Sequence, residues 1–146
     1  MIKLYTIGFT EKSAQTFFEL LEKNHVTKIV DTRISNRSQL SGFAKGRDLA
    51  FFADRLGNIA YEHRLEFAPT KELMSQYRKK MMPWDDYAKA YLDLLASRQI
   101  KDTIDIEALH ESCLLCSEHL PEQCHRRLLA EYLQQIHSDL EIIHLT

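Results

Sequence analysis

The sequence has little glycine or proline, no long apolar run and no excess of charge of one sign. Only 4 Gly and 3 Pro occur among its 146 residues, as in a folded globule rather than a disordered chain, and we expect no long linker. No apolar stretch approaches the roughly 20 residues of a membrane-spanning helix, so we expect no association with membranes. The net charge is −2, from 19 basic and 21 acidic residues. A diffuse basic surface for non-specific nucleic-acid binding is therefore excluded, and any anion site must be local.

Cysteine is also scarce, and the number of cysteines is odd. Three cysteines in a chain whose first residues show no secretory signal pattern predict a cytoplasmic protein with reduced thiols. Hydrophobic residues make up 45% and charged residues 27% of the chain, as in an ordinary folded domain. A chain of this length buries roughly two-thirds of the surface that its unfolded form exposes. We therefore predict a single domain over residues 1–146, and we expect no cofactor.

Short apolar runs alternate with helical patterns along the chain. The runs that we predict to be strands cover residues 1–8, 26–30, 59–61, 113–116 and 140–145. A strand, a helix and a further strand in this rhythm imply parallel pairing with right-handed crossovers. We therefore predict an α/β fold, a three-layer α/β/α arrangement with a mainly parallel sheet of about five strands. A helical insertion over residues 71–97 follows the third strand.

The starts of several helices carry recognisable capping residues. Ser13 precedes a helical pattern and is a predicted N-cap, and a helix is predicted to start at Thr70. Asp48 is a second predicted cap, for a helix that Gly57 ends. Residues 104–110 are predicted to form a further short helix before the fourth strand.

Reactive side chains are densest between residues 112 and 127. The apolar run 113–116 suits a strand buried on both faces, and Pro121 fits the first position of the helix that follows. The strand end then carries Cys116 and Glu118, and the first helical turns carry Cys124, His125 and Arg126. In open α/β sheets, ligands bind at the carboxyl ends of the strands, and unpaired amides at a helix start favour anions.

The second strand brings further charged groups to the same edge of the sheet. Asp31 and Arg33 follow it directly, and Gly8 ends the first strand. Residues 32–47 contain no acid and four basic residues, of which Arg37 and Lys45 lie in the middle and near the end. Arginine binds phosphate and carboxylate groups bidentately. We therefore interpret this segment as a functional anion-binding loop; the alternative is a solvated surface loop.

The same motifs resemble a known family. Residues 115–118 (Leu-Cys-Ser-Glu) and 124–127 (Cys-His-Arg-Arg), together with residues 6–8 and 31–33, resemble the bacterial and archaeal family called Domain of Unknown Function 488. The resemblance runs nearly end to end, and residues 39–45 and 65–71 resemble one branch of the family. It implies that Gly8, Lys45, Thr70 and Lys71 belong to the ligand site. It names positions rather than a reaction.

The charged groups predict a site for a small anionic ligand, either phosphorylated or nucleotide-like, or for a nucleic-acid end. Asp31 and Glu118 are candidates for acid or base roles, and Arg33 and Arg126 would hold the charge of the ligand. This many charged groups at one edge exceeds what a core requires, because buried charge is costly without partners. The alternative is that Asp31 and Arg33 form a structural ion pair with Arg126 or Glu118.

The cysteines and one histidine allow two kinds of chemistry. Cys116 or Cys124 is a candidate nucleophile if its thiolate is stabilised at the helix start beside His125. Alternatively, these three residues ligate zinc, with Glu118, His119 or a water as the fourth ligand. Against zinc, adjacent residues of a helix point about 100° apart, so the main interpretation assigns no metal ligand. Cys113 and Cys116, three positions apart on a strand, must point to opposite faces.

A third class is a non-catalytic module that binds nucleic acid or protein. The basic loop, with Phe43 available for stacking, could follow a single strand of nucleic acid. Against it, the carboxylates of Asp31 and Glu118 would repel a phosphate backbone.

A further group of residues lies within the helical insertion. These residues either roof the cleft at the carboxyl ends of the strands or simply pack on the sheet: Tyr77, Met81, Met82, Trp84 and Tyr87.

Overall fold

The computed structural model describes residues 1–36, 42–118 and 120–146. The strands are β1 (Ile2–Gly8), β2 (Lys28–Asp31), β3 (Ala60–His63), β4 (Ser112–Cys116) and β5 (Leu140–Leu145). The helices are α1 (Ala14–Lys23), α2 (Gly46–Gly57), α3 (Lys71–Arg78), α4 (Trp84–Ser97), α5 (Ile100–Thr103) and α6 (His125–Ile136). Arg37, a predicted ligand-binding residue, and His119, a candidate fourth zinc ligand, lie outside the described residues.

The five strands form one sheet in the order β3-β2-β4-β1-β5, and every pair is parallel. The register places Gly8 beside Cys116, and Asp31 beside Leu115. The ends of β1, β2 and β4 therefore lie at one edge of the sheet. This confirms that Asp31, Gly8 and Cys116 share the carboxyl edge, and it confirms the parallel α/β fold.

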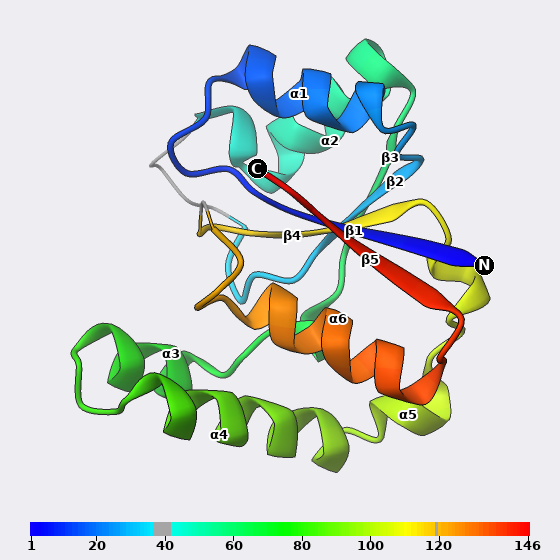
Figure 1. Ribbon diagram of the computed structural model, residues 1–146. Helices are drawn as coiled ribbons and strands as arrows, with labels where there is room; N and C mark the ends of the chain where they lie inside the picture. Colours follow the sequence, from blue (N-terminus) through cyan, green and yellow to red (C-terminus); the bar gives the residue numbers. More distant parts are fainter. Residues whose placement is uncertain (37–41, 119) are drawn as a thin grey trace.

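Helices cover both faces of the sheet, which gives the predicted three layers. Helices α1 and α2 lie on one face, and α4 and α6 lie on the other, with α3 beside α4 (Figure 1). Side chains of β4 alternate between the two cores: Leu114 packs on the α4–α6 side, and Cys113 and Leu115 pack on the α1–α2 side. All five residues of β4 are buried, so the prediction of a strand buried on both faces is confirmed.

The predicted helical insertion is confirmed with its bounds. It consists of α3 and α4, which together run from Lys71 to Ser97 after β3. Residues 104–110, in contrast, are not the predicted short helix. Helix α5 ends at Thr103, and only the 3₁₀ turn Glu107–Leu109 follows before β4. None of the described helices combines the length and the apolar character needed to cross a bilayer.

The predicted N-cap Ser13 and the predicted helix start at Thr70 are confirmed, and two other helix starts differ. The hydroxyl oxygens of Ser13 and Thr70 accept hydrogen bonds from the backbone N–H groups of the third residues after them, both at 3.1 Å, which satisfies amides that the helix leaves unpaired. Helix α2 begins two residues before Asp48, at Gly46. Pro121 does not start α6: residues 121–124 form a turn, and the helix begins at His125 with Cys124 as its N-cap.

Candidate functional site

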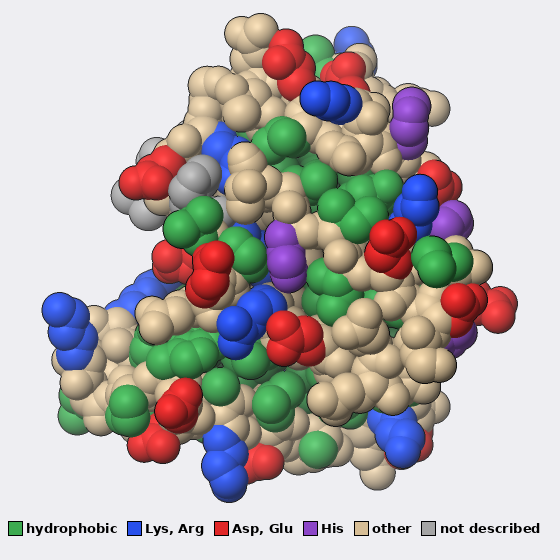
Figure 2. All heavy atoms as spheres, viewed as in Figure 1, with side chains coloured by type: hydrophobic (Ala, Val, Ile, Leu, Met, Phe, Trp, Pro, Cys, Tyr) green, Lys and Arg blue, Asp and Glu red, His purple; other side chains and the backbone are tan. Residues whose placement is uncertain are grey.

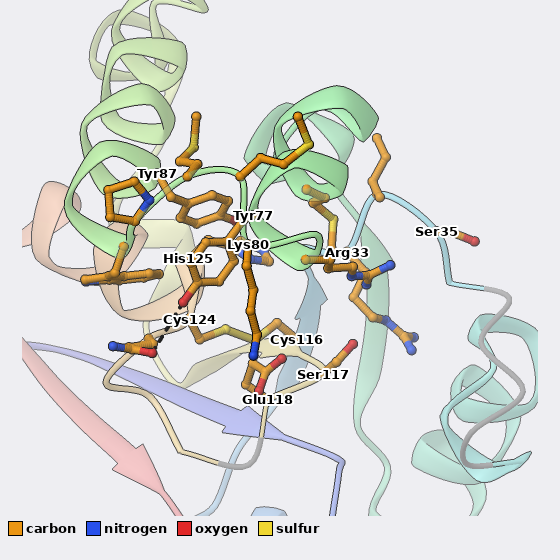
Figure 3. A pocket seen from close by; sticks show the side chains of 18 residues that line it. Arg33, Ser35, Tyr77, Lys80, Tyr87, Cys116, Ser117, Glu118, Cys124 and His125 are labelled. Atoms are coloured by element: carbon orange, nitrogen blue, oxygen red, sulfur yellow. Dashed lines mark hydrogen bonds between the residues drawn. A yellow bond between two sulfur atoms is a disulfide. The ribbon is translucent and has the colours of Figure 1, made fainter.

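A cavity of about 810 Å³ opens at the carboxyl edge of the sheet, and we call it the edge cavity. Its floor consists of the end of β4 and the start of α6, and its roof is the α3–α4 insertion. Figure 3 shows the side chains of Tyr77 and Lys80, from the roof, extending toward Cys116 and Cys124. The volume lies within the range of roughly 300–1,000 Å³ that is usual for small-molecule sites.

Three aromatic rings form one wall of the edge cavity. The ring of Tyr77 lies 4.7 Å from that of Tyr87 and 5.8 Å from that of Trp84, and the Trp84 and Tyr87 rings stack at 5.4 Å. Tyr87 is buried in the core, while Tyr77 and Trp84 are partly buried against it. Both alternatives for this helical pair therefore hold, because the same side chains pack on the core and line the cavity.

Positive charge predominates in the lining. Arg33, Arg78 and Lys80 contribute cationic side chains, and Glu118 is the single acidic residue among the described lining residues. Arg78 and Lys80 are exposed to solvent, whereas Arg33 is 5% exposed. Over the face seen in Figure 2, acidic and basic side chains are interspersed. The excess of positive charge in the edge cavity is thus a local feature, as the small net charge of the chain requires.

Arg33 forms a bidentate ion pair with Asp31. Its Nε and Nη2 donate to the two carboxylate oxygens at 2.9 and 2.8 Å, and Nη2 also donates to the carbonyl of Ala44. The guanidinium lies over the ring of Phe9, with its central carbon 5.1 Å from the centroid. The remaining nitrogen, Nη1, is buried without a hydrogen-bond partner among the described residues. Arg33 lines the edge cavity, and its Nη1 is therefore a buried donor that these residues do not use.

Asp31 does not line the edge cavity. It is fully buried, and it is in register with Leu115, whose side chain packs in the α1–α2 layer. Besides Arg33, it accepts a hydrogen bond from the hydroxyl of Tyr61. Burial and the Asp31 carboxylate raise the pKa of the Tyr61 hydroxyl, so this proton stays on Tyr61. The predicted structural ion pair thus exists, but it joins Asp31 to Arg33 rather than to Arg126 or Glu118.

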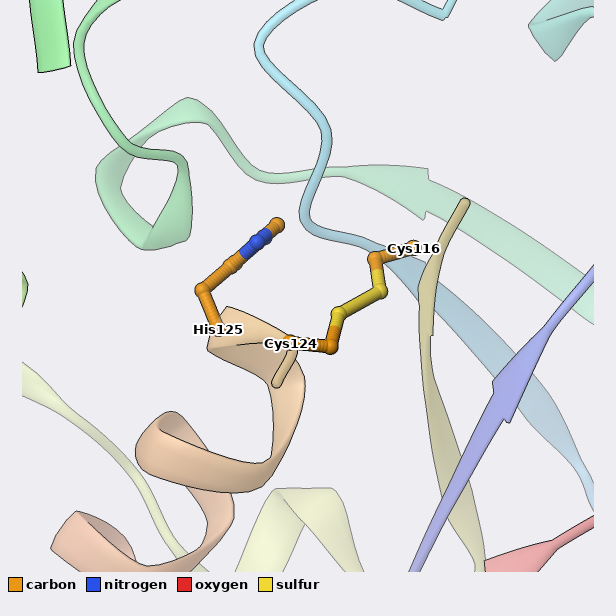
Figure 4. Close-up of side chains that lie close together, drawn as sticks. All are labelled: Cys116, Cys124 and His125. Carbon is orange, nitrogen blue, oxygen red and sulfur yellow. A yellow bond between two sulfur atoms is a disulfide. The ribbon is translucent and has the colours of Figure 1, made fainter. Parts of the chain in front are cut away.

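Cys116 and Cys124 are joined by a disulfide across the floor of the edge cavity. Figure 4 shows how the end of β4 and the first turn of α6 bring the two sulfur atoms together beside His125. The prediction of reduced thiols is therefore wrong for this pair, and in this state neither sulfur is a nucleophilic thiolate. Cys113 is the free cysteine and is buried, on the opposite face as predicted.

His125 is buried against the end of β2. Its Nε2 lies 3.0 Å from both the carbonyl oxygen and the hydroxyl oxygen of Thr32. A carbonyl oxygen only accepts, so Nε2 carries the proton of the neutral ring. Burial lowers the pKa of His125 to about 4, which keeps the imidazole neutral near pH 7. The hydrogen bonds of His125 to described residues all involve Nε2, and none of them uses Nδ1.

Arg126 lies beneath the loop between β4 and α6 and not in the cavity lining. It is fully buried, and its guanidinium donates to Thr6 Oγ1 at 3.3 Å, to Cys116 Sγ at 3.2 Å and to the carbonyl of Glu118. Burial lowers its pKa to about 10, so it remains a cation near neutral pH. The predicted ligand-binding residue therefore holds the loop that forms the floor of the cavity.

Gly8 permits the close approach of the same loop. A Cβ atom on Gly8 would lie 1.5 Å from the carbonyl oxygen of Glu118, which is far inside van der Waals contact. Gly8 does not line the edge cavity. Its position next to Cys116 in the register instead makes it a positioning residue for the β4–α6 loop.

The remaining predicted ligand residues lie apart from the edge cavity. Lys45 is the N-cap residue of α2, and Thr70 is the N-cap of α3. Lys71 is exposed at the start of α3. The structure therefore brings Arg33, Cys116, Glu118, Cys124 and His125 together in one lining and leaves out Asp31, Gly8, Lys45, Thr70, Lys71 and Arg126.

Sequence reasoning missed Arg78 and Lys80. Arg78 is the last residue of α3, and Lys80 lies in the turn that follows, directly before the methionine and aromatic residues of the roof. The sequence did contain a signal for these two residues, because they lie next to the aromatic residues that we considered as a roof of the cleft. Phe43, which was expected to be available for stacking on bases, instead packs against the rings of Phe17 and Phe18 at 5.2 and 6.0 Å.

One comparison with known proteins identifies a relationship. The family model described as "Domain of unknown function DUF488" matches residues 13–133, which is most of the chain. No curated protein and no solved structure matches. The match runs from α1 into α6, and so it includes the floor and the roof of the edge cavity.

Proposed function

This chain belongs to the DUF488 family, and from that premise we propose that it binds a small anionic ligand of the nucleotide type in the edge cavity. The observation that carries this proposal is the combination of a stacked aromatic wall with a cluster of cations around one space of about 810 Å³. A nucleotide has a planar base and a charged phosphate, and these two parts require the same two kinds of surface.

The aromatic wall provides a place for the base. Tyr77 and Trp84 are partly buried, so their rings are held by the core while part of their surface is accessible. Stacking of a base on an aromatic ring contributes about 1–3 kcal/mol. Stacking does not depend strongly on which base is present, so this wall supports a class of ligands rather than one nucleotide.

The cations provide a place for the phosphate. Arg78 and Lys80 present flexible, exposed charges, while Arg33 contributes a buried guanidinium whose Nη1 has no partner in the described part of the chain. The start of α6 adds backbone N–H groups and the positive end of the helix dipole. Arg33 follows β2, Arg78 ends α3, Lys80 lies in the turn between α3 and α4, and the N–H groups belong to the start of α6. A phosphate bound among these groups would therefore hold the insertion against the sheet.

If the bound ligand is also processed, Glu118 is the carboxylate in position to exchange a proton with it. Glu118 lines the edge cavity and is exposed. Asp31, whose two oxygens are occupied by Arg33 and Tyr61, serves to hold Arg33. A nucleic-acid end is the second form that the ligand can take, since it carries the same base and phosphate.

Intrinsic fluorescence tests the proposal directly, because the single tryptophan of the sequence, Trp84, lies in the aromatic wall. Nucleoside monophosphates, free nucleosides, inorganic phosphate and short oligonucleotides are titrated separately. The proposal predicts that the monophosphates change Trp84 emission with higher affinity than either the nucleosides or phosphate. Tighter binding of the oligonucleotides would favour the nucleic-acid end.

Paired variants separate the edge cavity from the rest of the surface. Arg78→Ala removes a cation of the lining and is expected to weaken nucleotide binding about tenfold, the effect of losing a contact of roughly 1.4 kcal/mol. Lys71→Ala, at the other end of the same helix, removes an exposed cation outside the lining and is expected to leave the affinity unchanged. No fluorescence change with any of these ligands, or an equal loss in both variants, would overturn the proposal.

A further inference from the structure

The Cys116–Cys124 disulfide and His125 together have a property that the proposed nucleotide site does not use. One potential metal-ligating atom from each of these residues lies within 4.8 Å of the other two. The residues are 2%, 3% and 6% exposed, and all three line the edge cavity. We propose that the reduced form of this cluster binds one zinc ion through the two cysteine sulfurs and Nδ1 of His125.

The spacing of the two cysteines suits a shared ion. Their Cα atoms lie 7.6 Å apart, beyond the roughly 4.4–6.8 Å usual for disulfide-linked residues. A thiolate sulfur lies about 2.3 Å from zinc. An ion between the two sulfurs therefore allows the two cysteines to lie farther apart than a direct S–S bond does. The separation is therefore at least as well matched to a metal bridge as to a disulfide.

The backbone of Cys124 removes the geometric objection to this set of ligands. Adjacent residues of a helix diverge by about 100°, but Cys124 is not helical. It is the N-cap of α6, with extended torsion angles (φ −134°, ψ 142°). Its side chain is therefore not held to the divergence of adjacent helical residues. Figure 4 shows it directed to the sulfur of Cys116, and a potential ligand atom of His125, the first helical residue, lies within 4.8 Å of both sulfurs.

His125 is held in the manner of a metal ligand. Its Nε2–H donates to the backbone carbonyl of Thr32 at 3.0 Å, which fixes the ring and leaves Nδ1 with the lone pair. Ligating histidines almost always donate their other ring N–H to a carbonyl, a carboxylate or water. The orienting hydrogen bond is thus present in the protein, and only the sulfurs have to change state.

Reduction and metal binding balance as two steps. A phosphine reductant, in water, cleaves the S–S bond to give two thiols and is itself oxidised to the phosphine oxide. Zinc then replaces the two thiol protons, which leave to solvent. Two thiolates offset the charge of the ion, and the Arg126 guanidinium, whose Nη1 lies 3.2 Å from Cys116 Sγ, is placed to interact with the negative charge of that sulfur. The fourth ligand, a water or an anion, enters from the edge cavity, as in zinc sites with an open position.

Cobalt titration of the reduced protein tests the site, since Co²⁺ bound by thiolates in tetrahedral geometry absorbs in the near-ultraviolet and visible. The protein is reduced with the phosphine, freed of metal and titrated with Co²⁺, after which Zn²⁺ displaces it. We expect saturation at one ion per chain for the reduced protein and no such spectrum for the oxidised protein. Absence of the thiolate bands after verified reduction would overturn the proposal.

Cysteine variants assign the ligands. Cys116→Ser and Cys124→Ser are expected to abolish the thiolate spectrum, whereas Cys113→Ala, which removes the buried thiol on the opposite face of β4, is expected to leave it intact. Alkylation of wild-type protein supplies a readout that needs no variant, because bound zinc should protect Cys116 and Cys124 from iodoacetamide. Retention of the spectrum in both serine variants, or equal alkylation with and without zinc, would contradict the assignment. The titration contains no nucleotide, so its outcome is independent of that of the proposed function.

Discussion

The ion pair between Asp31 and Arg33 makes a strong quantitative prediction. Asp31 is 0% exposed and Arg33 is 5% exposed, and two hydrogen bonds join their side chains. Arg33→Ala would leave the carboxylate of Asp31 buried with the hydroxyl of Tyr61 and the backbone N–H of residue 33 as its donors. Removing one partner of a buried pair costs about 3–5 kcal/mol. For a domain of this size, such a loss lowers Tm on the order of 10 °C.

Urea unfolding of three variants measures this cost. Lys89→Ala is the matched control, because it breaks an ion pair with Asp93 whose side chains are 81% and 71% exposed, and we expect a loss below about 0.5 kcal/mol. The double variant Asp31→Leu/Arg33→Met removes both charges, so it should lose less stability than Arg33→Ala alone. The reasoning fails if Arg33→Ala loses under about 1 kcal/mol, or if the double variant is less stable than the single one.

Two further variants probe the loop and the roof of the edge cavity. Gly8→Ala forces the carbonyl of Glu118 away from the end of β1, so we expect a loss of about 1–3 kcal/mol in the free energy of unfolding, together with weaker nucleotide binding; unchanged unfolding would refute the close approach. Thr70→Ala removes the hydrogen bond to the N–H of Leu73 and should cost about 1 kcal/mol without changing the affinity for nucleotides. Loss of nucleotide binding in a folded Thr70→Ala variant would instead support the role in the ligand site that sequence reasoning assigned to Thr70.

The fold was predictable because its signals are local. Ser13 and Thr70 cap helices through hydrogen bonds to residues only three positions away. The run Cys113–Cys116 is apolar at every position, which indicates a strand covered on both faces, and a strand with helices on both sides belongs to a parallel sheet. The order of the strands was not predictable, since the pairing of β4 between β1 and β2 depends on contacts between residues far apart in sequence.

The site was predictable only in part, because each side chain depends on partners that sequence does not reveal. The pattern correctly placed Asp31 and Cys116 at one edge of the sheet. The strand register determines which face of the sheet each side chain points to. Tertiary packing determines that the carboxylate of Asp31 forms an ion pair with Arg33. Likewise, Pro121 satisfied the local rule for a helix start, but the turn at residues 121–124 places Cys124 next to Cys116.

A crystal structure of the protein with a bound nucleoside monophosphate tests the central claim most directly. The account predicts that the base lies against Tyr77 or Trp84, and that the phosphate is within hydrogen-bond distance of Arg33, Arg78 or Lys80. A nucleotide seated elsewhere, such as the groove between α1 and α2 lined by Phe18, would contradict it, as would the absence of any bound nucleotide at a concentration well above the Kd measured in solution.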